Sequence, residues 1–430
     1  MFVTFLKLTK SLRRSHFVRG GVIFGSTSFL VSILNYGFNL LVARSFPLAT
    51  YGEYMAALSY LALFGVPLGS IGILLIQKIG QQPPEHRLDF VLGLEQWLWQ
   101  QIAKRWLSIC VITTVLFGFL WWKSGLSLLS LIFVFLLSVL STFSLIYTVA
   151  LQAFKRFFEA GGLSIVSTTV KLCGLLIVLL VSKSLFGVYG VLLLAGLVMV
   201  LFGRFLVRRN GKSASPMDIA TRHVSLARFL KQKSFLIPII TSLGLVGILS
   251  ADVILAKKVL PPDDVGLYAA LSLLSKIILY VAAPLGTVAF TFFTGKESQQ
   301  QRTKILLLTT MALLCIGVVS IGSYLFLPNI IISVIFGSKY DSIQSFVWLS
   351  AVFGLLYSLA NVFAQYWISR QSWLAVASVF ALALQILGII IFHSSLGQIM
   401  SVNIVLTGIL LLVYSLGFGR LLLENKLVRS

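Results

Sequence analysis

Charged residues are scarce in this sequence. They make up 11% of the 430 residues, whereas hydrophobic residues make up 58%, and soluble domains carry roughly 25% charged residues. The mean hydropathy is +1.00. A chain this apolar cannot bury its hydrophobic side chains inside a water-soluble globule. The sequence therefore predicts an integral membrane protein and argues against a soluble enzyme or binding domain.

Residues that build chemical sites are also few. The three cysteines all fall inside apolar runs, which indicates packing rather than a disulfide framework or a metal site. The four histidines are scattered and form no catalytic cluster. The segment nearest to a phosphate-binding loop, Gly211-Lys212-Ser213, has Leu206 where that motif requires its first glycine. We expect neither an enzyme nor an ATP-driven pump, and no bound cofactor.

Long apolar runs are what the sequence has in abundance. A membrane helix needs about 20 mostly apolar residues, and twelve such runs predict an all-α polytopic membrane protein. The predicted spans lie near 20–41, 52–79, 105–122, 126–152, 161–182, 185–207, 234–256, 266–294, 305–327, 343–368, 373–392 and 398–420.

A basic stretch divides these spans into two sets of six. We predict an N-terminal lobe at 1–207, a basic cytoplasmic linker at 208–233 and a C-terminal lobe at 234–430. Within the linker, Ser215 followed by Pro216 is typical of a helix N-cap and first turn. The linker is therefore expected to carry a short amphipathic helix.

One motif occurs twice, half a chain apart. The stretch "VARSFPLATYGEYMAAL" begins at Val42, and "AKKVLPPDDVGLYAALS" begins at Ala256. In this register Gly52 aligns with Gly266. The motif matches spans 1–2 with spans 7–8, and because six is even, both copies cross the membrane in the same direction. We predict two six-helix lobes related by a parallel repeat around a central cationic cavity, which favours alternating access over a channel.

The 34 basic residues far outnumber the 12 acidic ones, and the net charge is +22. With both termini in the cytoplasm, 26 of the basic residues fall in cytoplasmic segments and six in outer loops. This is the positive-inside pattern of a multi-pass protein. The charge therefore indicates contact with anionic membrane lipids rather than with nucleic acid.

Four cations are candidate substrate ligands. Lys171 and Lys276 lie inside predicted spans, where a charge costs about 2.5 kcal/mol or more and is functional by default. Arg44 and Lys258 occupy matching positions at the outer ends of spans 1 and 7. The alternatives are an ion pair between Asp252 and Lys276, and simple snorkelling of Arg44 and Lys258 to the interface.

Polar residues accompany these cations. Asn35 and Asn39 share one face of span 1, where they would line a wet cavity or bond to a neighbouring helix. Acidic residues near the predicted cavity are few, and Asp252 and Glu53 are candidate coupling carboxylates. A site with this balance of charge favours an anionic substrate.

Three stretches resemble a known family. They are "LLVARSFPLATYGEYMAALSYLALFG", "SADVILAKKVLPPDDVGLYAALSLL" and "VIFGSKYDSIQSFVWLSAV". Their order and spacing are similar to those of the polysaccharide flippases, nearest to the O-antigen flippase group, of the multidrug/oligosaccharidyl-lipid/polysaccharide (MOP) exporter superfamily. The resemblance carries over as site residues only Arg44, Asp252 and Lys258, which lie in these motifs.

The resemblance implies a flippase for an undecaprenyl-diphosphate-linked oligosaccharide, moving it from the cytoplasmic to the outer face of the bacterial inner membrane. It also implies a glycan polymerase and a chain-length regulator as protein partners. The membrane potential is worth about 2.3 kcal/mol per charge per 100 mV, and proton or sodium coupling is a further option. A MATE-like exporter of small organic molecules and a non-transporting membrane scaffold are the rival functions.

Overall fold

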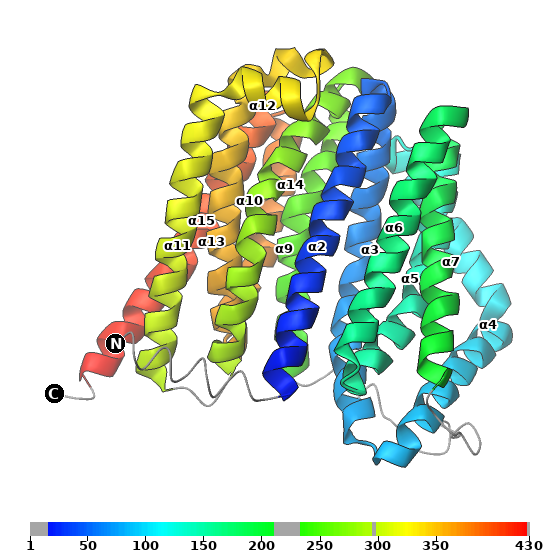
Figure 1. The fold of residues 1–430 in the computed structure, drawn as a ribbon. Helices are drawn as coiled ribbons and strands as arrows, with labels where there is room; N and C mark the ends of the chain where they lie inside the picture. Colours follow the sequence, from blue (N-terminus) through cyan, green and yellow to red (C-terminus); the bar gives the residue numbers. More distant parts are fainter. Residues whose placement is uncertain (1–15, 210–232, 295–297, 428–430) are drawn as a thin grey trace. The chain divides into compact units, whose positions relative to one another are not determined.

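The computed structural model describes residues 16–209, 233–294 and 298–427, and every regular element in those ranges is helical (Figure 1). The predicted amphipathic helix of the linker lies outside the described residues. The elements are α2 (His16–Ser45), α3 (Leu48–Gln81), η1 (Pro84–His86), α4 (Arg87–Ser124), α5 (Leu128–Ala153), α6 (Phe157–Val181), α7 (Leu185–Arg209), α9 (Lys233–Val259), α10 (Pro262–Thr294), α11 (Gln299–Phe326), α12 (Pro328–Ile335), η2 (Ser338–Phe346), α13 (Val347–Ser369), η3 (Trp373–Val376), α14 (Ala377–Ile391) and α15 (Leu396–Leu427).

Eleven helical segments among the described residues are long and apolar enough to cross a membrane. The remaining predicted span, 105–122, lies in the second half of α4, where most side chains are outside the described set. α4 is bent at Arg105, whose φ and ψ are −118° and 17°. The chain is a multi-pass membrane protein with an all-α fold.

Large apolar side chains project outward from these helices. Leu180 is 86% exposed, and Val181 and Phe326 are each 80% exposed. In water such surfaces would drive aggregation, whereas lipid tails solvate them. The described surface therefore fits a protein whose solvent is the bilayer.

The described residues form two compact units. The first holds 16–39, 68–119 and 135–209, and the second holds 40–67, 120–134, 233–294 and 298–427. In α3 the boundary falls at Pro67, although the helix continues through that residue. The ends of α2 and α3 that meet at their connection therefore pack with the C-terminal helices. The lobes predicted at 1–207 and 234–430 stay a prediction.

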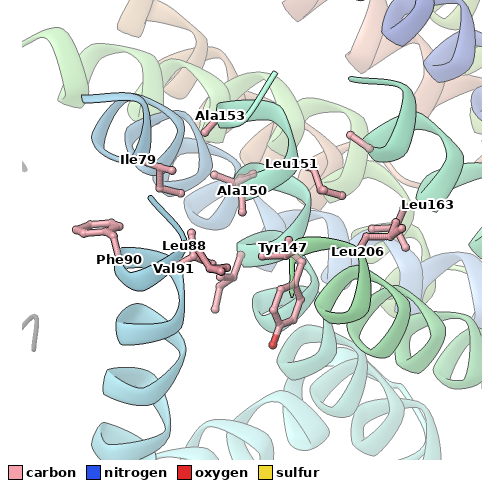
Figure 2. Packing of buried hydrophobic residues seen from close by; sticks show 14 of the residues in the cluster. Ile79, Leu88, Phe90, Val91, Tyr147, Ala150, Leu151, Ala153, Leu163 and Leu206 are labelled. Atoms are coloured by element: carbon pink, nitrogen blue, oxygen red, sulfur yellow. The ribbon is translucent and has the colours of Figure 1, made fainter. Parts of the chain in front are cut away.

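The first unit has a hydrophobic core where α3, α4, α5, α6 and α7 meet. Figure 2 shows this cluster around Tyr147 of α5, with Leu88 and Val91 from α4 and Leu206 from α7. Small residues let the helices approach closely, as membrane helices require. A Cβ on Gly203, for example, would lie 2.9 Å from the Cβ of Tyr147.

The second unit is organised around α13. This helix contacts α10, α11 and α15, and α9 packs against α14 (Figure 1). Most of α13 is buried, because it has helices on several sides rather than lipid. The unit holds the candidate site residues of α9 and α10.

The two glycines aligned by the repeated motif contact each other inside the second unit. A Cβ on Gly52 would lie 2.8 Å from the backbone nitrogen of Gly266, and a Cβ on Gly266 would collide with the carbonyl of Leu48. No side chain fits between these backbones, so α3 and α10 cross here because both positions are glycine.

Candidate functional site

Lys171 lies near the middle of α6 and is half-buried. Its ammonium group donates a hydrogen bond to Oδ1 of Asn35 on α2. Asn39, one turn further along α2, donates from Nδ2 to the carbonyl of Asn35, 3.1 Å away. The structure thus brings Lys171 together with the Asn35 and Asn39 pair, which the sequence marked separately from it. We name Asn35, Asn39 and Lys171 the lysine–amide cluster.

This cluster leaves Lys171 with unused hydrogen-bonding capacity. An ammonium group has three donors, and one of them is directed at Asn35. No ion pair of Lys171 with an acidic residue occurs within the described part of the chain. The site is therefore a cation held by a neutral amide, which suits binding of an anion or of sugar hydroxyls.

An analogous position in the second unit carries a neutral residue. Gln385 of α14 follows Lys171 by the same number of residues as Gly266 follows Gly52, so the repeat aligns Gln385 with Lys171. Gly174 and Gly388 follow three residues later in each copy, and each faces a valine of the next long helix. Gln385 donates to the carbonyl of Ile248 on α9, 3.0 Å away. Sequence analysis missed Gln385 because a glutamine in a span carries no charge signal.

Asp252 is fully buried in α9 of the second unit. Its Oδ2 accepts from the hydroxyl of Tyr268 at 2.9 Å, and its Oδ1 accepts from the backbone N–H of Val253 at 2.7 Å. Asn403 of α15 donates to the Tyr268 oxygen at 2.8 Å, and Gln385 donates to Oδ1 of Asn403 at 2.7 Å. We name these four side chains, Asp252, Tyr268, Gln385 and Asn403, the aspartate network.

The direction of every bond in the aspartate network follows from one fixed acceptor. The Ile248 carbonyl can only accept, so Gln385 presents its NH₂ group to it and to Asn403. Asn403 must then direct its own NH₂ group at Tyr268, which leaves the hydroxyl proton of Tyr268 for Asp252. The side chains of the network are therefore oriented so that a hydroxyl donor faces the carboxylate, as an ionised Asp252 requires.

Lys276 is half-buried in α10 and lies within electrostatic range of Asp252. Among the described residues, however, no ion pair within 4.0 Å joins the two. Tyr268 and Val253 occupy the Asp252 oxygens instead. The ion pair considered as the alternative for Asp252 and Lys276 is thus not formed as a direct contact.

Arg44 and Lys258 are exposed at the ends of α2 and α9. Nη2 of Arg44 lies 3.5 Å from the carbonyl of Ser333. Both side chains lie in the second unit, which also holds Glu53, Asp252 and Lys276, whereas the lysine–amide cluster lies in the first. The four predicted cations therefore do not form one cluster within either unit.

Glu53 of α3 binds the start of α5. Its Oε1 accepts from the backbone N–H of Ser127 at 3.2 Å and from the hydroxyls of Ser127 and Ser130. The first turn of a helix has unpaired N–H groups and a positive dipole end, and a carboxylate there is stabilising. These contacts favour a structural role for Glu53.

Replacing Glu53 tests that role. Glu53→Ala should lower the free energy of unfolding by about 1–2 kcal/mol, the usual effect of losing a helix cap, with transport activity per folded molecule retained. Glu53→Gln keeps Oε1 as an acceptor and should be milder. Thermal unfolding in detergent measures the stability. Loss of transport at unchanged thermal stability would instead assign Glu53 to coupling.

No group of three or more His, Cys, Asp or Glu residues in the described ranges is arranged to hold a metal ion.

No protein-family model matches the chain, and no curated protein matches its sequence.

Solved structures do share its fold. The lipid II flippase MurJ, in an inward closed conformation, superposes with a TM-score of 0.70 at 14% identity, covering 93% of this chain and 87% of that one. An inward-facing multidrug resistance MATE transporter of the MOP superfamily gives 0.65 at 14% identity, covering 92% and 95%. A eukaryotic MATE transporter gives 0.63 at 14% identity, covering 96% and 95%. The chain therefore shares the fold of these solved transporters.

Proposed function

We propose that this protein is a flippase that moves an undecaprenyl-diphosphate-linked oligosaccharide from the cytoplasmic to the outer face of the bacterial inner membrane. The observation that carries the proposal is the lysine–amide cluster, a cation and two amides in the middle of membrane helices. The fold shared with a lipid II flippase supports it.

The chemistry of the cluster matches the two parts of such a head group. An ammonium group with free donors binds phosphate oxygens through charge-assisted hydrogen bonds. Amides have both donors and acceptors and therefore suit sugar hydroxyls. The exposed cations Arg44 and Lys258 would attract the diphosphate on its way out, and the lipid tail would stay in the bilayer.

Transport is proposed to run by alternating access without ATP. The membrane is negative inside, so outward movement of an anion releases about 2.3 kcal/mol per charge per 100 mV. Proton or sodium coupling would act through the aspartate network. In that network, Oε1 of Gln385 is a buried oxygen without a hydrogen-bond partner among the described residues.

A MATE-like exporter of small organic molecules is the second candidate, because solved multidrug transporters share the fold over almost their whole length. An exporter of organic cations would need a carboxylate facing its substrate. Asp252, the carboxylate nearest to that role, already accepts three hydrogen bonds and is fully buried. We therefore favour the flippase, with both termini in the cytoplasm and with anionic lipids, a glycan polymerase and a chain-length regulator as partners.

Complementation tests the proposed function. The chain, expressed in a bacterium that lacks its own O-antigen flippase, should restore polysaccharide at the cell surface, measured by gel electrophoresis of extracted lipopolysaccharide. Expression in a strain stripped of drug exporters is the parallel assay. Drug resistance without restored polysaccharide in a panel of hosts with different sugar repeats would favour the exporter.

A further inference from the structure

The carbonyl end of α2 is bound by two side chains from η2. The ammonium group of Lys339 donates to the carbonyl of Arg44 at 3.0 Å and to that of Phe46. The hydroxyl of Tyr340 donates to the carbonyl of Ala43 at 3.0 Å. All of these residues lie in the second unit. Two consecutive residues thus bind two carbonyls of the last turn of α2 and the carbonyl of Phe46, just after the helix, nearly 300 positions earlier in the chain.

Electrostatics explains why a lysine stands there. The last carbonyls of a helix have no intrahelical donors and form the negative end of its dipole. A cation at this end is stabilising, and the Lys339 ammonium group is placed there with two carbonyls as ligands. Tyr340 is fully buried, and its ring packs edge-on against Tyr51 at 6.4 Å between centroids. The contact therefore combines a polar part with a small aromatic part.

The neighbouring contact of α3 with α10 is made by two glycines. Gly52 and Gly266 bring the two backbones together, and the side chain of Val265 packs against Gly52. The segment of α3 that belongs to the second unit ends at Pro67. A proline inside a helix removes one backbone hydrogen bond and makes that position a preferred bending point.

We infer that Lys339 and Tyr340 form a latch on the carbonyl end of α2, and that its release opens the predicted outer end of the transport path. The inference rests on the alternating access in the proposed function, though not on the identity of the substrate. In the latched state the three carbonyls have protein donors. In the released state water replaces those donors, and α3 bends at Pro67, moving the end of α2 that is connected to it.

Spin-label distances test the latch in the full-length protein reconstituted in liposomes. Labels are attached to cysteines at Ser45 on α2 and Asn329 on α12, both exposed, after the three native cysteines are replaced by serine. Lys339→Met removes the cation, and Tyr340→Phe removes only the hydroxyl while keeping the ring. Lys304→Met, at an exposed lysine of α11, is the matched control.

We expect Lys339→Met to raise the ratio of longer to shorter label distances about tenfold, as the loss of one or two hydrogen bonds predicts. Tyr340→Phe should act in the same direction by roughly threefold, and the control should match the wild type. Unchanged distances in both latch variants would overturn the inference. Because no substrate is needed, shifted distances together with drug resistance and no restored polysaccharide across the panel of hosts would reject the flippase and keep the latch.

Discussion

We expect Lys171→Met to lower translocation roughly 10- to 100-fold while leaving the protein inserted and folded. The reduction is what the loss of one charge-assisted hydrogen bond to a phosphate, about 1.5–3 kcal/mol, would give. The neutral methionine also removes a charge from the membrane, which favours insertion by about 2.5 kcal/mol or more. Transport and membrane level should therefore change in opposite directions. Surface polysaccharide in the complemented strain, divided by protein detected in isolated membranes, measures both.

The opposite signs separate a binding role from a structural one. If Lys171 only tied α6 to α2 through Asn35, Lys171→Met would lower the protein level together with transport. Asn35→Ala leaves the cation in place without its amide and should give an intermediate loss. Lys104→Met, at an exposed lysine of α4, is the matched control and should transport normally. Full activity of Lys171→Met would remove the lysine–amide cluster from the mechanism.

The membrane fold was predictable because its signals are local. Apolar runs of span length are set by bilayer thickness, and nearly all the predicted spans correspond to described helices. The repeated Gly52 and Gly266 could also be found, because a backbone contact leaves no choice of residue. What the pattern could not give was that these two glycines contact each other.

The polar contacts were less predictable, because they join helices that are distant in the sequence. The amphipathic spacing of Asn35 and Asn39 and the charge of Lys171 were each visible, yet their pairing depends on how α2 packs against α6. The ion pair considered for Asp252 and Lys276 was inferred only from their similar predicted depth in the membrane. Tyr268, rather than Lys276, contacts Asp252 directly, because Tyr268 and Asp252 lie on the facing sides of α10 and α9.

Lys339 shows a different limit of sequence reasoning. Exposed lysines near a helix end usually snorkel or bind lipid, and one in a loop carries no signal of its own. Its ligands are backbone carbonyls, which every residue possesses, so no residue type on α2 identifies the contact. Only the fold places the ammonium group of Lys339 on the last turn of that helix.

Asp252→Asn is the second variant with a large expected effect, and it should separate coupling from stability. The amide imitates a neutral, protonated side chain and keeps an oxygen for Tyr268 or Val253 but not for both. Burying an amide costs less than burying a carboxylate without a direct partner cation, so thermal stability should hold within about 1 kcal/mol. Transport in liposomes should fall roughly tenfold or more and lose its dependence on an imposed proton or sodium gradient.

The direction of the hydrogen bonds in the aspartate network makes this outcome specific. With an ionised Asp252, the donors of Gln385, Asn403 and Tyr268 all point toward the carboxylate. A cation that neutralises Asp252 weakens the hydrogen bond that the Tyr268 hydroxyl donates to it. Because Tyr268 belongs to α10 and is bonded to Asn403 of α15, the charge on Asp252 of α9 then affects how α10 and α15 pack. Asp263→Asn, at an exposed carboxylate in the first turn of α10, is the matched control. If Asp252→Asn transported with an unchanged gradient dependence, the network would be a structural element and coupling would have to lie elsewhere.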